Sequence, residues 1–201
     1  MNKVKYVLAS ACVSAVGALA PTAKAEPMTH DGFYLALEAG LGYMSATADG
    51  PFAEEKLSGT TFSSALLLGG TVGPAVIGGG FTYDTAFSPS YELNGRSVEL
   101  EDVTLYLIGI GAFVDVYPDP TQGLHFLGFV GWGGLEMAVN GNAGGSDPTG
   151  MLLTLGAGYD FWLANEWSVG PLARFTYAPL SKDDLDVNTT HFALVADFKF
   201  H

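Results

Sequence analysis

The chain has 201 residues, 27 of them glycine, with 8 Lys and Arg against 21 Asp and Glu. This acidic balance argues against a nucleic-acid-binding protein, which needs a basic surface, and 48% hydrophobic residues beside 14% charged ones argue against disorder. The length suits a single domain, and a glycine content about twice the usual 7% favours strands that pack closely.

The N-terminus has the three-part pattern of a secretory signal peptide. A short basic start precedes an apolar run over residues 6–20, and Ala23-Lys24-Ala25 forms a small-x-small cleavage site. We expect residues 1–25 to be removed by cleavage after Ala25, leaving residues 26–201 as the mature domain. A lipoprotein signal that ends at Cys12 is the alternative, with a shorter apolar run. Cleavage after Ala25 leaves no cysteine, and therefore no disulfide.

The rest of the chain alternates apolar with small or polar residues at a period of two, which predicts β-strands. In the first strand Phe33 and Leu35 share one face, and Tyr34 and Glu38 share the other. Two of the segments are apolar on both faces, so their inward sides stay open. A tilted strand needs about 9–11 residues to cross a membrane, and each segment is long enough. The eight predicted strands are residues 32–45, 60–72, 75–86, 102–116, 123–137, 150–162, 166–178 and 189–200, of which the fourth and fifth are the two with apolar faces.

The connections between these strands alternate in length. Long loops on one side of a barrel and short turns on the other are typical of outer-membrane barrels. An even number of strands brings both termini to the side of the short turns, which is then periplasmic. The long segments, extended to Asp102, hold 11 of the 21 acidic residues, which predicts an acidic extracellular rim. The long segments are 46–59, 87–101, 138–149 and 179–188; the tight turns are 73–74, 118–122 and 163–165.

The two faces of the strands distinguish a membrane barrel from a soluble, lipocalin-like one. One face is large and aliphatic with aromatic residues near its ends, which suits contact with lipid. The other is rich in glycine and small residues, which suits the crowded interior of eight strands. We therefore predict an all-β fold, a single eight-stranded antiparallel transmembrane β-barrel. Pro171 falls in mid-strand, where it cannot donate to the ladder, and we expect a bulge there.

These features resemble the small outer-membrane β-barrel proteins of Gram-negative bacteria, the superfamily that includes OmpX, OmpW and the barrel of OmpA. The resemblance covers nearly the whole mature chain and is one of pattern. It implies a monomer in the outer membrane that contacts lipid and lipopolysaccharide and is inserted by the outer-membrane assembly machinery. In that family a terminal aromatic residue is read by this machinery; Phe198 and Phe200 fit such a signal, although His201 follows them.

Several charged residues are expected on the inner face, where charges must be paired or hydrated. They predict either a salt-bridge network that plugs the barrel or a thin, cation-preferring water path. Inward glycine pairs such as Gly78/Gly80 and Gly156/Gly158 either leave space for that path or relieve curvature and neighbouring aromatic rings, and we favour relief. The expected inward residues are Glu38, Asp84, Asp160, Arg174, Asp197 and Lys199.

Metal and enzyme chemistry have weaker signals. Asp183, Asp184 and Asp186 have the oxygen ligands that Ca²⁺ prefers but lack the spacing of an EF-hand, so a solvated acidic rim is favoured. Some small outer-membrane barrels modify lipids with Ser and His near the outer rim. Here only His191 is expected near that rim, beside Ser181 and Asp183, and no nucleophile motif is present. We expect no catalytic site and no cofactor.

Three hypotheses of function follow. The first is a non-enzymatic outer-membrane protein, structural or surface-interacting through its acidic extracellular loops. The second is a narrow pore or carrier for small cationic or apolar solutes. The third, which the residues favour least, is a lipid-modifying enzyme.

Overall fold

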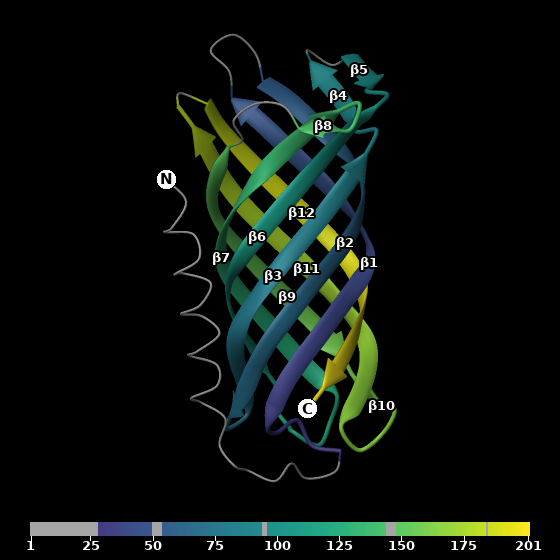
Figure 1. Ribbon diagram of the computed structural model, residues 1–201, viewed down its shortest axis with the longest axis vertical. Helices are drawn as coiled ribbons and strands as arrows, with labels where there is room; N and C mark the ends of the chain where they lie inside the picture. The colour runs from purple at the N-terminus through teal and green to yellow at the C-terminus, as the bar shows by residue number, and fades with distance from the viewer. Residues whose placement is uncertain (1–27, 50–53, 94–95, 144–147, 184) are drawn as a thin grey trace.

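The computed structural model describes residues 28–201 except 50–53, 94–95, 144–147 and 184. Eight long antiparallel strands form one closed barrel (Figure 1). Because β1 pairs with both β2 and β12, none of the eight is left with a free edge. The predicted all-β barrel is confirmed. The eight strands are β1 (Phe33–Asp49), β2 (Glu54–Val72), β3 (Ala75–Phe87), β6 (Val103–Val116), β7 (Leu124–Val139), β9 (Thr149–Tyr159), β11 (Trp167–Lys182) and β12 (Leu185–Phe200).

Four short strands lie at the ends of the barrel. At one end β4 (Ser90–Leu93) and β5 (Arg96–Glu99) form a hairpin that continues the sheet from β2, and β8 (Asn142–Ala143) pairs with β7. We call this the loop end, drawn at the top of Figure 1. The opposite, turn end carries the C-terminus, the predicted tight turns and β10 (Phe161–Trp162), which pairs with β11.

Two of the four predicted long loops are wrong, because the strands continue beyond the apolar belt. Residues 46–49 pair with 54–57, and residues 179–182 pair with 185–188. The outward side chains of these extensions are mostly polar, so a pattern of hydrophobicity does not identify them as strands. Alternate side chains such as Ala46, Leu180 and Val187 are buried inside the barrel. The other two long connections hold the β4–β5 hairpin and β8.

The exterior of the barrel is apolar and its interior is partly polar. Leu41, Ile110 and Trp132 are 65%, 67% and 62% exposed, and large aliphatic and aromatic side chains cover the outer surface around them. A soluble monomer does not expose a continuous apolar surface of this extent. No helix in the described part of the chain is long and apolar enough to cross a membrane.

The structure assigns the inward sides of β6 and β7, which their sequences left open. Leu105, Leu107 and Phe113 point inward from β6, and Leu127 and Phe129 from β7. Inward glycines make room for these rings. A Cβ atom on Gly78 would lie 2.7 Å from Cε1 of Phe113, closer than real carbon atoms approach. The glycines thus relieve crowding by aromatic neighbours.

Pro171 is accommodated without a bulge, so the expected bulge is wrong. Leu172 pairs with Gly158 and Val169 with Phe161, in one continuous register. Pairing with the neighbouring strand lapses at Pro171 and the residue before it, and again at Ala178 and Pro179, but the register is unchanged on both sides of each gap. The amide of Asp160, which lies opposite this gap, donates instead to the carbonyl of Gly123 at 2.8 Å.

Two apolar clusters fill separate levels of the interior. The inner cluster, toward the turn end, includes Tyr34, Phe113 and Phe129. The outer cluster, toward the loop end, includes Met44, Leu107 and Leu180. Polar side chains occupy the levels between and below them.

Candidate functional site

A buried polar cluster separates the two apolar clusters. Arg174 on β11 donates from Nη1 to Oε2 of Glu38 on β1 at 2.6 Å, and its Nη2 lies 3.5 Å from Oδ1 of Asp84 on β3. Nδ1 of His191 on β12 lies 3.5 Å from the other Asp84 oxygen. All four residues are at most 3% exposed. We call Glu38, Asp84, Arg174 and His191 the arginine cluster.

The arginine cluster contacts a buried serine. Nε2 of His191 lies 2.8 Å from Oγ1 of Thr61 and 3.2 Å from Oγ of Ser63, so Ser63, His191 and Asp84 have the residue types of a catalytic triad. Ser63 is fully buried, however, whereas a catalytic nucleophile must contact its substrate. The expected grouping of His191 with Ser181 and Asp183 is wrong, because His191 faces the interior and those residues are exposed.

A second polar cluster closes the barrel at the turn end. Nζ of Lys199 lies 2.9 Å from a carboxylate oxygen of Asp160, 2.9 Å from one of Asp197 and 3.4 Å from one of Asp115. The ammonium is fully buried, as are its partners. We call Asp115, Asp160, Asp197 and Lys199 the lysine cluster. Its formal charge is −2, since three carboxylates face one ammonium.

Neutral side chains add further hydrogen bonds to the lysine cluster. Tyr34 donates to Asp115 at 3.1 Å, and Tyr117 donates to Asp160 at 3.0 Å. Burial raises the pKa of Tyr117 well above its usual value, so its phenol stays a donor. Nδ1 of His125 lies 2.8 Å from Asp115. Such hydrogen bonds offset part of the cost of burying an ion network.

All six charges expected on the inner face lie in these two clusters, four acids and two bases. Sequence reasoning missed Asp115 and His125, which lie at the ends of the two strands with apolar faces. Both faces of these strands are apolar, so the alternation assigned no direction to either residue. Only the structure shows that the odd-numbered positions of β6, from Leu105 to Asp115, face inward.

The C-terminal residues lie against the outside and the mouth of the barrel. Phe198 is 38% exposed and stacks on Trp167, with ring centroids 4.9 Å apart. Phe200 also contacts Trp167. His201 folds into the mouth, where its amide donates to the carbonyl of Glu166 at 2.9 Å.

The loop end is acidic. The exposed acids at this end outnumber the basic residues Lys56, Arg96 and Lys182. Of the three aspartates suggested for Ca²⁺, Asp183 lies in the turn after β11, Asp186 lies in β12, and Asp184 is outside the described residues. That calcium site stays a prediction. We call the exposed acids the acidic rim: Glu55, Glu92, Glu99, Glu101, Asp102, Asp183 and Asp186.

Comparison with known proteins supports the fold. The model of the outer membrane protein beta-barrel domain family matches residues 8–200. No curated protein matches the chain. Among solved structures, Neisserial surface protein A gives a TM-score of 0.54 at 16% identity, over 84% of this chain and 96% of that one. OprG from Pseudomonas aeruginosa gives 0.51 at 11% identity, over 88% and 100%. At such identities the likeness shows the fold alone.

Proposed function

Because this chain belongs to the outer membrane protein β-barrel family and resides in the outer membrane of a Gram-negative bacterium, we propose that it is a non-enzymatic protein that acts by surface interactions at its acidic extracellular end. The observation that carries this proposal is the filled interior. Two apolar clusters and two ion clusters occupy successive levels of the barrel. Eight strands leave an interior just wide enough for side chains.

The loop end offers the groups that such an interaction needs. With this end outside the cell, the acidic rim presents a negative surface that attracts a basic partner. The hairpin adds an open edge, because among the described residues β5 pairs with β4 alone and its four residues are all exposed. An open strand edge binds an extended peptide through main-chain hydrogen bonds. The partner that fits both features is a protein with a basic, extended segment.

The remaining surface supports a membrane-embedded monomer. We propose that the apolar exterior contacts outer-membrane lipid and lipopolysaccharide, and that Phe198 and Phe200 are read by the assembly machinery. Their rings pack on Trp167 at the turn end, which is the periplasmic end in this orientation. No cofactor is part of this function.

The filled interior predicts that the protein does not conduct ions. Purified protein, refolded and added to planar bilayers, should give no reproducible channels, because buried side chains block each level of the barrel. A porin measured in the same bilayers is the positive control. Reproducible cation-selective channels contradict the filled barrel and support the narrow pore.

The acidic rim predicts charge-dependent binding of a basic protein. The triple variant Glu99→Gln, Glu101→Gln, Asp102→Asn should bind cytochrome c about tenfold more weakly at low salt, since each exposed ion pair contributes roughly 0.2–1 kcal/mol. Binding is measured by surface plasmon resonance on protein in zwitterionic nanodiscs. Asp119→Asn, in the turn between β6 and β7 at the opposite end, is the matched control. Equal losses in both variants, or no loss in the triple variant, argue against the rim as the binding surface.

A further inference from the structure

The segment before β1 crosses the mouth of the barrel at the turn end. The amide of Met28 donates to the carbonyl of Asn165 at 2.9 Å, and the amide of His30 donates to that of Pro120 at 3.1 Å. The amide of Thr71 on β2 donates to the carbonyl of Gly32, also at 2.9 Å. The segment is therefore tied to three elements, and these bonds hold His30 beneath the lysine cluster.

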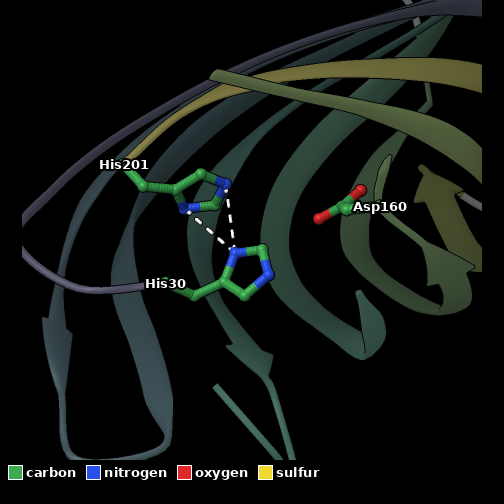
Figure 2. Close-up of side chains that lie close together, drawn as sticks. All are labelled: His30, Asp160 and His201. Carbon is green, nitrogen blue, oxygen red and sulfur yellow. Dashed lines mark hydrogen bonds between the residues drawn. The ribbon is translucent and has the colours of Figure 1, made fainter. Parts of the chain in front are cut away.

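This crossing brings His30 from one end of the chain against His201 from the other. Nδ1 of His30 lies 3.3 Å from Nδ1 and 3.1 Å from Nε2 of His201 (Figure 2). The carboxylate of Asp160 lies beside them, and one ligand atom from each of the three residues falls within 4.8 Å of the others. The side chains of His30, Asp160 and His201 are 2%, 2% and 3% exposed. We call these three residues the mouth site.

Two atoms of the mouth site have no hydrogen-bond partner in the described structure. They are Nε2 of His30 and Oδ1 of Asp160, and both are buried. A buried polar atom without a partner is costly, and in native proteins it often marks an ion or water site. The other groups are already held in place: Ser168 Oγ lies 3.0 Å from His201 Nε2, and Asp160 Oδ2 accepts from Tyr117 and Lys199.

The neighbouring group of potential ligands already contains a cation. His125, Asp160 and Asp197 also lie within ligand distance of one another. Nζ of Lys199, however, lies 2.9 Å from Asp160, 2.9 Å from Asp197 and 3.1 Å from Nε2 of His125. The ammonium thus occupies the position of an ion there. In the described part of the chain, no lysine or arginine side chain hydrogen-bonds to His30 or to Oδ1 of Asp160.

We propose that the mouth site binds one Zn²⁺ ion through His30, His201 and Asp160, and that the ion joins the two ends of the chain across the barrel. Two imidazoles and a carboxylate are ligands that Zn²⁺ prefers. Bonds of 2.0–2.1 Å in a tetrahedral site place ligand atoms roughly 3.3 Å apart. Nδ1 of His30 lies 3.3 and 3.1 Å from the two ring nitrogens of His201, and the ligand atoms of all three residues lie within 4.8 Å of one another.

The protonation state of the histidines suits this role. Burial lowers the pKa of His30 to about 4 and that of His201 to about 2. Both imidazoles are therefore neutral at neutral pH, and each keeps a lone pair that can bind a metal. Without the metal, the same burial makes protonation of either ring unfavourable.

The test is calorimetric titration of the full chain, purified from outer membranes and stripped with EDTA, with Zn²⁺ alone. The folded protein should bind one equivalent. His30→Gln and a chain that ends at Phe200 should each bind at least about tenfold more weakly, since even the loss of a group behind a ligand costs 10–100-fold. His125→Gln and His191→Gln, two other buried histidines, are the matched controls and should bind as the wild type does.

Folding is scored separately by the shift in gel migration between unboiled and boiled samples. One mouth-site variant that shows the gel shift of a folded barrel is enough to test Zn²⁺ binding. The chain that ends at Phe200 is expected to fold, because it retains all of β12. Absence of Zn²⁺ binding by the folded wild type overturns the proposal. So does binding that is lost in His125→Gln but kept in a mouth-site variant, because that result places the ion in the lysine cluster.

Discussion

Replacing Arg174 with Met should lower the free energy of unfolding by about 3–5 kcal/mol, the usual cost of removing one partner from a buried ion pair. Met retains the volume of the side chain but leaves Glu38 and Asp84 buried without their cation. Tryptophan fluorescence during urea unfolding in detergent micelles measures the loss, with gel migration as a second probe.

Two further variants separate this charge effect from general damage. Arg96→Met, on the exposed strand β5, should change stability by less than about 0.5 kcal/mol. Adding Glu38→Gln to Arg174→Met should recover part of the loss, because it removes one of the uncompensated charges. A loss in Arg174→Met as small as that in Arg96→Met contradicts the role of the arginine cluster.

Lys199→Met should be at least as destabilising as Arg174→Met, by about 3–5 kcal/mol or more. The ammonium contacts three carboxylates, and its removal leaves Asp115, Asp160 and Asp197 facing one another in a buried site. The same urea titration measures the effect. Lys56→Met is the control, since Lys56 lies near the acidic rim and is only half-buried.

The lysine prediction also distinguishes a structural cluster from a hydrated path. If water filled this level of the barrel, the carboxylates of Lys199→Met would remain solvated, and stability would change by no more than in Lys56→Met. A large loss is expected because the three carboxylates and the ammonium are all at most 2% exposed. The losses in the free energy of unfolding expected for the two cases differ by about 3 kcal/mol or more.

Much of the barrel could be predicted from the sequence because its two environments differ so strongly. In β1, β9, β11 and β12 most outward side chains are large and apolar, whereas most of the inward ones are small or polar. The inward direction of Glu38 or Arg174 follows from this alternation within one strand. The ion pair between Glu38 and Arg174 could not be predicted in this way, because it joins β1 and β11 across the interior. Which residues of two tilted strands lie at the same level cannot be read from the sequence of either strand alone.

The residues that the sequence did not reveal lie where alternation carries no information. In β6 and β7 both faces are apolar, so Asp115 and His125 had no assigned direction. His30 precedes the first strand and His201 follows the last, outside any periodic segment. Their proximity arises only when the barrel closes. The two wrong loop predictions have a related cause. The strand extensions beyond the apolar belt have mostly polar outward side chains, so a pattern of hydrophobicity does not mark them as strands.

Barrel closure has a consequence for the order of assembly. The seam pairs Leu35–Asp49 of β1 with Asp186–Phe200 of β12, so nearly the whole described chain lies between the partners. Contacts this distant in sequence form slowly, since a long loop must be closed before they are gained. Until β12 arrives, β1 and β11 each present an unpaired edge that can join another chain. Productive folding therefore requires that β1 does not pair with another chain before β12 reaches it.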